Sequence, residues 1–337
     1  MTSMKDISKA CGVSIATVSK ALNDQGDIGE ATKKRIRQTA RDMGYFPNSQ
    51  ARALKTNRTN NIGVLFIDDA NSGLTHSYFS KVLDSFKRTV EEKGYDITFI
   101  NGSDKGRKQL TLLEHCRYRG FDGVVIACVD FTNEQVKELA HSELPVVTID
   151  YLFDSGITVM SDNAKGMKDL LTYVYSCGHR KIAYLHGADS YVTRTRVSSF
   201  FETADSLGLH IPENYIREVP YRHTAMAESI TRELLMQKDR PTCILYPDDY
   251  SCFGGINAIR AMGYRIPQDI SVAGYDGISM GRQMQPQLTT ITQDTARMGS
   301  VAAKKLLVQI ENPKLSTHET VMVSGILYTG GTVAPIN

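Results

Sequence analysis

The sequence predicts an α/β protein with two parts: a head of three short helices, and a larger two-lobed body built on doubly wound parallel sheets. From residue 61 onward, segments rich in Val and Ile alternate with amphipathic helical segments, which is typical of parallel sheets covered by helices. The chain has 337 residues, enough for two such lobes besides the head. The head is predicted by helical segments that follow one another closely before residue 45.

The helices of the head are marked by their caps. Ser3 is followed three residues later by Asp6, the pattern of a capping box at a helix start. Gly12 can adopt the positive φ that ends this helix, and Ser14 is a good N-cap for the next one. Gly44 ends a third helix. Two helices joined by so short a turn predict a helix-turn-helix. The second and third helices are expected at about residues 15–22 and 30–43.

The body shows two successive series of strands and helices. In the first series, strands are expected at 62–67, 97–101, 123–129 and 145–150, and helices at 78–93, 107–119 and 133–141. The second series begins near residue 160, with strands at 181–186, 216–220, 243–246 and 270–275, and helices at 193–207, 225–237, 251–262 and 297–310.

Ligands of doubly wound sheets bind beyond the carboxyl ends of the strands. Several of these ends carry acids, and two facing lobes would aim them at a shared cleft. These acids are Asp68, Asp69, Asp150, Asp162, Asp248, Asp249 and Asp276. The arrangement predicts a binding protein that closes about a hinge on a small ligand.

The charge is distributed unevenly along the chain. Residues 1–60 carry eleven Lys and Arg but only five Asp and Glu, a net charge of +6. The remaining 28 basic and 32 acidic residues give the body a net charge of −4, so the whole chain shows only +2. A small basic head on a mildly acidic body is typical of nucleic-acid binding. The alternative, a solvated lysine-rich helix face, is made less attractive by the helix-turn-helix pattern.

Composition also excludes some classes of protein. The six cysteines are scattered without a C-x-x-C pair, which favours a reducing cytoplasm over a disulfide scaffold or a zinc module. No apolar run approaches the roughly 18 residues of a membrane span, and the first ten residues are polar. We therefore expect a cytoplasmic protein without a membrane segment, a bound metal or a cofactor.

Motifs of common enzymes are missing from the sequence. Neither a phosphate-binding glycine loop nor H-E-x-x-H or G-x-S-x-G occurs. The acid pairs at residues 68–69 and 248–249 would suit a magnesium site or a glycosidase. Nothing in the sequence sets a distance between the two pairs, and an enzyme would leave the basic head unexplained. We expect a protein that is not an enzyme.

The head contains the segments Asp6–Ser14 and Thr17–Asn23, followed by Gly44–Asn48 and Ala51–Leu54. These segments resemble those of the lactose/galactose-repressor family of bacterial transcription regulators. In the body the similar segments are Pro145–Val147, Ser161–Asn163, Gly178–Ala183, Ile270–Asp276 and Leu288–Ile291. The resemblance covers about residues 3–325. It implies a periplasmic-binding-protein-like body, an effector in the cleft, and a homodimer on palindromic operator DNA.

The second helix of a helix-turn-helix enters the major groove with its N-terminal residues on the base edges. Ile15, Ala16 and Lys20 are therefore the expected base readers, with Lys20 able to donate to guanine. The alternative for Ile15 is a place in the core. Residues suited to phosphate contact are Ser14, Thr17, Ser19, Asn23 and Tyr45.

A short hinge follows the head. Asn48 can cap a helix that ends near Lys55, and so short a helix is marginal alone in water. In the resembled family two such helices pair in the minor groove, where a leucine wedges between base steps. The matching leucine is Leu54, and Arg52 and Lys55 flank it for phosphate contact.

The resemblance also points to effector-binding residues. In sugar-responsive members, pocket positions match Asp150, Arg196, Asp248 and Asp276, and an aromatic residue matches Tyr78 or Phe79. Carboxylates accept hydrogen bonds from vicinal hydroxyls and a guanidinium donates to sugar oxygens. The alternatives are that the acids cap helices and that Arg196 lies on a helix surface.

We therefore expect three parts: a DNA-binding helix-turn-helix domain (1–46), a hinge helix and linker (47–60), and an effector-binding and dimerisation body (61–337). The N-lobe would comprise about 61–161 and 292–323, and the C-lobe 162–291 and 324–337. The function would be that of a transcription regulator, a repressor, whose operator affinity is controlled by a small molecule, a sugar or sugar derivative. The alternative is a sugar-binding protein without DNA regulation.

Overall fold

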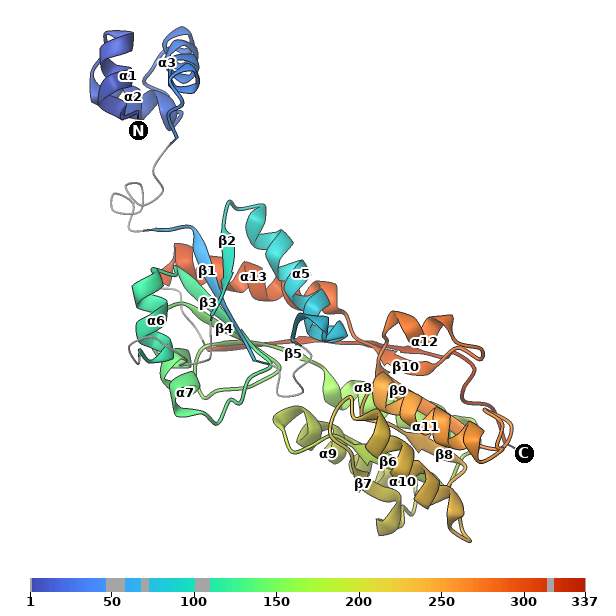
Figure 1. Cartoon of the computed structure of the whole chain (residues 1–337). Helices are drawn as coiled ribbons and strands as arrows, with labels where there is room; N and C mark the ends of the chain where they lie inside the picture. The colour runs from blue at the N-terminus through green and yellow to red at the C-terminus, as the bar shows by residue number, and fades with distance from the viewer. Residues whose placement is uncertain (1, 47–57, 68–72, 101–109, 314–317, 337) are drawn as a thin grey trace. The chain divides into compact units, whose positions relative to one another are not determined.

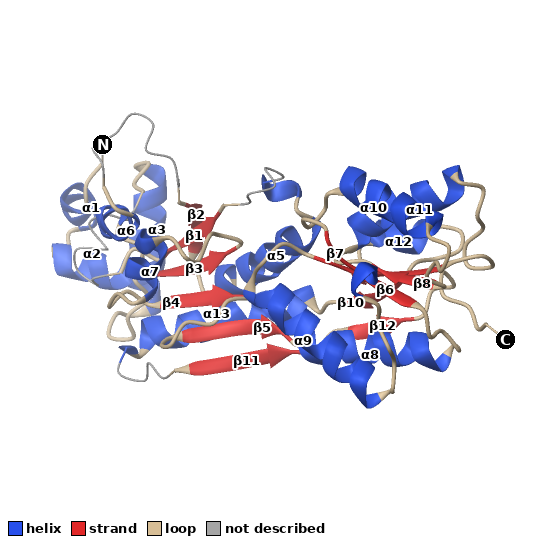
Figure 2. Ribbon diagram, turned by 90° about the horizontal axis from the view of Figure 1, so that it is seen from below, coloured by secondary structure: helices blue, strands red, loops and turns tan. Residues whose placement is uncertain are grey.

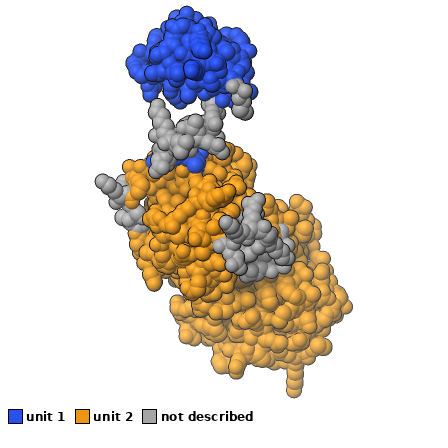
Figure 3. All heavy atoms as spheres, turned by 60° about the vertical axis from the view of Figure 1, so that its left-hand side comes forward, with its two compact units in different colours: residues 1–59 blue, residues 60–337 orange. Residues whose placement is uncertain are grey.

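The computed structural model describes residues 2–46, 58–67, 73–100, 110–313 and 318–336. Its chain divides into two compact units, residues 1–59 and residues 60–337, which are coloured separately in Figure 3. The hinge residues expected from the sequence, Arg52, Leu54 and Lys55, lie outside the described residues, as do Asp68 and Asp69.

Within its described residues, the head contains three helices, and the first two have the caps that the sequence predicts. Ser3 and Asp6 form a reciprocal capping box, and Gly12 ends the first helix with a φ of 62°. Ser14 accepts a hydrogen bond from the backbone N–H of Thr17 at the start of the second helix. The predicted helix-turn-helix is confirmed. The helices are α1 (Met4–Cys11), α2 (Ile15–Leu22) and α3 (Glu30–Asp42), labelled in Figure 1.

The first lobe of the body, here the N-lobe, contains a six-stranded sheet in the order β11-β5-β4-β3-β1-β2, with all pairs parallel. Its strands are β1 (Asn61–Phe66), β2 (Asp96–Phe99), β3 (Gly123–Ala127), β4 (Val146–Ile149), β5 (Ile157–Ser161) and β11 (Glu319–Val323). Its helices are α5 (Ser77–Glu91), α6 (Leu112–Arg119), α7 (Glu134–Ala140) and α13 (Thr295–Glu311), and a 3-10 turn, η1, spans Gly73–Thr75.

Alternation along the strands explains why helices cover both faces of this sheet. Ile62 and Val64 of β1 point to the face where α5 and α13 pack. Leu65 points to the opposite face, against α6 and α7. Successive side chains of a strand lie on opposite faces, so a strand covered on both sides must be apolar throughout. The doubly wound arrangement predicted from the Val- and Ile-rich segments is confirmed (Figure 2).

The second lobe, here the C-lobe, repeats this plan with the order β12-β10-β9-β8-β6-β7, in which β12 alone is antiparallel to its neighbour. Its strands are β6 (Ile182–His186), β7 (Ile216–Glu218), β8 (Cys243–Leu245), β9 (Ser271–Asp276), β10 (Thr289–Thr292) and β12 (Ile326–Tyr328). Its helices are α8 (Asn163–Ser176), α9 (Tyr191–Ser206), α10 (Thr224–Met236), α11 (Asp249–Ala261) and α12 (Ser279–Gln283), with a 3-10 turn, η2, at Glu213–Tyr215. Among the described residues, no helix is long and apolar enough to cross a membrane.

In the described part of the body, three short segments connect the two lobes. The chain passes from β5 to α8 at residue 162, from β10 to α13 at 293–294, and from β11 to β12 at 324–325. Two of these segments are joined, because the Ser324 hydroxyl donates to the Asp162 carboxylate over 3.0 Å. Asp162 also caps α8. The expectation that Asp162 faces the cleft is therefore wrong: its carboxylate is engaged at the crossing instead.

Packing of α11 against α10 depends on a glycine. A Cβ placed on Gly254 would lie 2.0 Å from the carbonyl oxygen of Thr224, the first residue of α10. That oxygen belongs to the backbone, so the two helices would have to separate. We expect Gly254→Ala to lower the free energy of unfolding by about 2 kcal/mol, as for other overpacked cores.

Urea unfolding of the full chain measures this effect. Asn257→Ala is the control, because Asn257 is exposed on the same helix and should change stability by less than about 0.5 kcal/mol. An equal stability for Gly254→Ala and the unmodified chain would contradict the packing argument.

Candidate functional site

The carboxyl ends of the two sheets border a cleft of about 630 Å³ between the lobes. The N-lobe contributes the start of α5 and the residues after β3 and β4. The C-lobe contributes the loops after β6 and β7 and the ends of β8 and β9. In both sheets the strand order reverses beside the first strand, β1 or β6, and such switch points are where doubly wound sheets bind ligands.

Backbone conformation also distinguishes this cleft. Cys128, Asp150, Arg222 and Asp276 all line it, and all have a positive φ, of 54°, 58°, 63° and 104° respectively. Residues other than glycine rarely adopt this region, and when they do they concentrate at functional sites. Strain at four lining positions supports the cleft as a binding site independently of its volume.

Arg196 is the most buried cation of the cleft, with 4% of its surface exposed. Its Nε donates to the side-chain oxygen of Asn163 over 2.8 Å, and its Nη1 donates to the carbonyl oxygen of Pro247 over 3.0 Å. The guanidinium carbon lies 3.5 Å from the centre of the Tyr275 ring, a cation–π contact. These contacts hold the guanidinium at the cleft wall without neutralising it by an ion pair.

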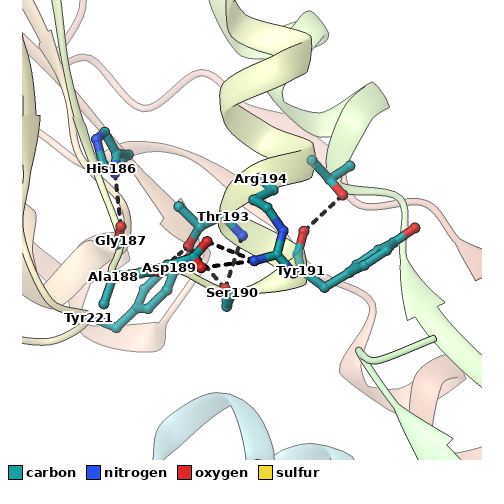
Figure 4. A network of polar contacts seen from close by, with 10 residues as sticks. His186, Gly187, Ala188, Asp189, Ser190, Tyr191, Thr193, Arg194 and Tyr221 are labelled. Atoms are coloured by element: carbon teal, nitrogen blue, oxygen red, sulfur yellow. Dashed lines mark hydrogen bonds and ion pairs between the residues drawn. The ribbon is translucent and has the colours of Figure 1, made fainter. Parts of the chain in front are cut away.

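The neighbouring Arg194 behaves differently. It forms an exposed ion pair with Asp189, with an N–O distance of 2.8 Å, as Figure 4 shows. In the same loop, the Thr193 hydroxyl bonds to the Ala188 carbonyl oxygen and to the Tyr221 hydroxyl, which fixes the start of α9. Of the two arginines, only Arg196 lines the cleft, and its burial is inconsistent with the alternative that it lies on the helix surface.

Asp150 lies across the cleft, on the N-lobe. The Tyr78 hydroxyl donates to its Oδ2 over 2.6 Å, and the backbone N–H of Ser161 donates to its Oδ1 over 2.8 Å. Burial raises the pKa of Asp150, and these hydrogen bonds and the charge of Arg196 oppose that shift. The structure thus brings Tyr78 and Asp150 together, with the phenol group of Tyr78 orienting the carboxylate.

Asp276 is the last residue of β9 on the C-lobe. Its Oδ1 accepts a hydrogen bond of 2.7 Å from the side-chain amide of Gln293. Gln293 in turn accepts a hydrogen bond from the Ser161 hydroxyl, which lies within 3.1 Å of the Tyr78 hydroxyl. Burial raises the pKa of Asp276 to about 7, although Arg196 opposes the shift. A chain of hydrogen bonds therefore connects the acids of the two lobes through Gln293, a residue that sequence reasoning missed.

Asp248 lines the cleft but is occupied by protein donors. Its Oδ1 accepts from the backbone N–H of Ser251, and its Oδ2 accepts from the Ser251 hydroxyl and the N–H of Arg222. It is thus the N-cap of α11, which was the alternative considered from the sequence. Asp249 does not line the cleft: Thr290 and the N–H of Ile278 engage it in the interior, where burial raises its pKa well above the ordinary value. The expectation that Asp249 faces the cleft is wrong.

Aromatic side chains supply much of the remaining wall. Phe131 and Tyr151 are stacked, with ring centres 4.2 Å apart and planes within 5° of parallel. Phe79, Tyr191 and Tyr221 also line the cleft. Apart from Phe79, none of these rings was identified from the sequence, where the only signal was their position after a predicted strand or at the start of a helix. No group of three or more His, Cys, Asp or Glu side chains among the described residues is arranged to hold a metal ion.

The head presents the expected base readers at the surface of α2. Ile15 is 47% exposed, so it is not part of the core, which Val18 and Ala21 fill from this helix. Ala16 is exposed, and Lys20 forms an ion pair with Asp27.

Residues expected to contact phosphates also lie on or beside α2. Ser14 is its N-cap and accepts from the backbone N–H of Thr17, and the Asn23 side chain donates to the Ser19 carbonyl at its end. Tyr45 packs against the core of the head. A role of any of these residues in DNA contact stays a prediction.

Residues 3–48 match the family model described as bacterial regulatory proteins, lacI family, and residues 171–333 match that of a periplasmic binding protein-like domain. The HTH-type transcriptional repressor PurR of Photobacterium profundum is 30% identical over 316 residues, 93% of either chain. The chain belongs to the lacI family of bacterial regulatory proteins. The repressor PurR of Haemophilus influenzae is 29% identical, over 92% of this chain and 91% of the relative.

Solved structures agree with this fold. A lac repressor dimer bound to operator and the anti-inducer ONPF has a TM-score of 0.82 and 21% identity, covering 99% of both chains. A complex of the transcriptional regulator CelR with cellobiose has a TM-score of 0.70 and 20% identity, covering 98% of this chain and all of the other. As a member of the lacI family, the protein is a DNA-binding transcriptional repressor of the helix-turn-helix type. The alternative of a sugar-binding protein without DNA regulation is set aside.

The raised pKa of Asp276 predicts a pH-dependent stability. The unfolded carboxyl ionises near its ordinary pKa of 3.8, whereas the folded one stays protonated up to about pH 7. The contribution of Asp276 to the free energy of unfolding therefore falls as the pH rises from about 4 to about 7. We expect Asp276→Asn to show a smaller fall over this range than the unmodified chain, because the amide cannot ionise.

Urea unfolding at about pH 5 and about pH 7 measures the difference. Asp205→Asn, at an exposed position of α9, is the control and should follow the unmodified chain. The other charged groups that line the cleft stay unchanged in both variants; they are Arg196, Arg222, Asp150, Asp189 and Asp248. Equal falls for Asp276→Asn and the control would contradict the assignment.

Proposed function

We propose that this repressor binds palindromic operator DNA as a homodimer, and that a sugar or sugar derivative in the cleft controls its affinity for the operator. Residues 1–46 would read DNA, residues 47–60 would form the hinge, and residues 61–337 would bind the effector and dimerise. The observation that carries the effector proposal is the arrangement of Arg196 opposite Asp150, with Asp276 beside it.

This arrangement suits a polyhydroxylated ligand. The guanidinium of Arg196 uses two of its donor groups on protein oxygens and presents the rest of its fork at the cleft wall. The Oδ2 of Asp276 has no protein donor among the described residues, so it can accept from a ligand hydroxyl. Aromatic walls such as the Phe131–Tyr151 pair suit the apolar face of a sugar ring. The likeness to structures that hold cellobiose or ribose supports the same ligand class.

The way in which a ligand would act on the hinge follows from the connections between the lobes. The hydrogen-bonded chain from Asp276 through Gln293 to Ser161 runs beside two of the three crossings. A ligand that engages Asp276 and Asp150 together would favour one angle between the lobes. A hinge helix as short as the sequence predicts would be marginal, so a change of angle across a dimer would shift it between helix and coil. Effector and operator would then influence each other's affinity reciprocally.

Replacement of Arg196 tests the effector site. We expect Arg196→Ala to weaken effector binding at least about a hundredfold, because buried acceptors of the ligand lose a charged donor. The effector is first identified by a thermal-shift screen of mono- and disaccharides with the full chain, and its affinity is then measured by calorimetry.

Arg194→Ala is the matched control, because Arg194 lies on the same helix but pairs with Asp189 at the surface. It should bind the effector as the unmodified chain does. Undiminished binding by Arg196→Ala, or an equal loss in both variants, would refute the proposed site.

Replacement of Leu54 tests the hinge. If the two leucines of a dimer wedge into the central base step, Leu54→Ala should weaken operator binding about tenfold or more and reduce the bend of the DNA. Gel-shift titration measures the affinity, and circular permutation of the site measures the bend. Thr56→Ala, in the linker that follows, is the control. An unchanged affinity and bend for Leu54→Ala would rule out the wedge.

A further inference from the structure

The turn between α2 and α3, residues 23–29, carries two acids that serve different helices. Asp24 binds two cations of α3, with N–O distances of 3.1 Å to Lys33 and 2.7 Å to Arg37. Asp27 binds Lys20 of α2. Asp24 therefore anchors the turn to α3. Asp27 instead pairs with α2, the helix that we expect in the major groove.

The Lys20–Asp27 pair adds little to the stability of the head. The two side chains are 44% and 54% exposed, and ion pairs in that setting stabilise a protein weakly. The turn is held by other contacts: backbone N–H groups of Asn23 and Gln25 donate to the carbonyl oxygens of Ser19 and Lys20, both over 3.0 Å. The stability of the head therefore does not explain why an acid lies at position 27.

The pair lies next to the expected base readers. Lys20 follows Ala16 by four residues on α2, so their side chains share one face of the helix. Asp27 is an exposed carboxylate, ionised at neutral pH, and the hydrogen bond from Lys20 lowers its pKa further. The Asp27 carboxylate therefore lies beside the Lys20 ammonium on the helix face that we expect to approach DNA.

We propose that Asp27 is a specificity-determining residue of the repressor, which directs the Lys20 ammonium to a guanine edge and away from DNA phosphates. The inference rests on the proposed role of α2 in reading DNA. An ammonium has three N–H donors. One remains on Asp27, and two can reach O6 and N7 of guanine, which are neutral acceptors. The ion pair can stay intact in this complex.

The Lys20–Asp27 ion pair disfavours contact with a DNA phosphate. A phosphate would bring its negative charge next to the Asp27 carboxylate, and the resulting repulsion offsets much of the attraction to Lys20. Non-specific binding of DNA comes almost entirely from neutralised phosphates. Asp27 thus weakens non-specific binding more than binding to a site with guanine at the right position, which widens the ratio between the two affinities.

Asp27→Asn tests the proposal, because it removes the charge and retains a side-chain oxygen that can accept from Lys20. Asp42→Asn is the matched control: Asp42 is an exposed acid at the end of α3, bonded to Gln38, and its loss changes the net charge of the head equally. Lys20→Ala identifies the base position that the lysine reads. All variants are made in the full chain.

The operator is first selected with the unmodified chain from duplexes randomised over about 20 base pairs, the span of two half-sites. Affinities are then measured for the selected duplex, for versions with guanine replaced by adenine at one symmetric position at a time, and for a random-sequence duplex, at several NaCl concentrations.

We expect Asp27→Asn to bind the random duplex about threefold more tightly, with a salt slope steeper by about one for each head. Its preference for guanine should fall about fivefold or more at the position identified by Lys20→Ala. Asp42→Asn should keep the slope and the preference of the unmodified chain.

Several outcomes would overturn the proposal. A specificity ratio and salt slope unchanged in Asp27→Asn would show that Asp27 is only a surface counter-ion, and equal effects of Asp42→Asn would show that net charge alone matters. A double variant, Lys20→Asp with Asp27→Lys, keeps an ion pair between these positions but has no lysine at position 20 to contact a base. If this variant recovers full specificity, the role of Asp27 is structural. If the unmodified chain selects no sequence, the proposed operator reading itself is wrong, and that result is distinct from the others.

Discussion

The burial of one guanidinium, that of Arg196, is the constraint on which the effector cleft depends. A buried cation must be solvated by its neighbours, and here they come from three separate elements: Asn163 at the start of α8, Pro247 after β8, and Tyr275 on β9. Satisfying Arg196 therefore fixes the ends of these elements relative to one another. The same charge opposes the raised pKa values of Asp150 and Asp276, and so allows two acids to be buried at one site.

The connection between the lobes is built from the same polar groups. Ser161 ends the last N-lobe strand before the first crossing, and Gln293 lies in the second crossing. Their hydrogen bond joins Asp276 of one lobe to the Tyr78–Asp150 pair of the other. A ligand bound at these acids, as we propose, would therefore act directly on the segments that connect the two lobes.

The head depends on contacts that are more local along the chain than those of the cleft. Its core is small, and its boundaries are set by local caps such as Ser3 and Gly12. Its surface charge is organised by the acids of one turn, where Asp24 supports α3 and Asp27 accompanies Lys20. The expected base readers Ile15, Ala16 and Lys20 are therefore outside the core of the head, so they could vary without loss of the fold.

The sequence by itself determined the head, the doubly wound body and five residues of the cleft: Tyr78, Asp150, Arg196, Asp248 and Asp276. The caps, the strand–helix alternation and the acids at strand ends are local, because they depend on neighbours along the chain. The strand β5 and the helix α8 were not predicted as elements: the second series was expected to begin near residue 160, but its first expected strand was 181–186.

Only the tertiary structure decided which polar groups remain available to a ligand. It assigned Asp248 to the cap of α11 and Asp249 to the interior, and it brought Gln293 and the Phe131–Tyr151 stack to the cleft. The physical reason is that satisfaction of a hydrogen bond depends on donors supplied by distant segments, which no local pattern in the sequence specifies.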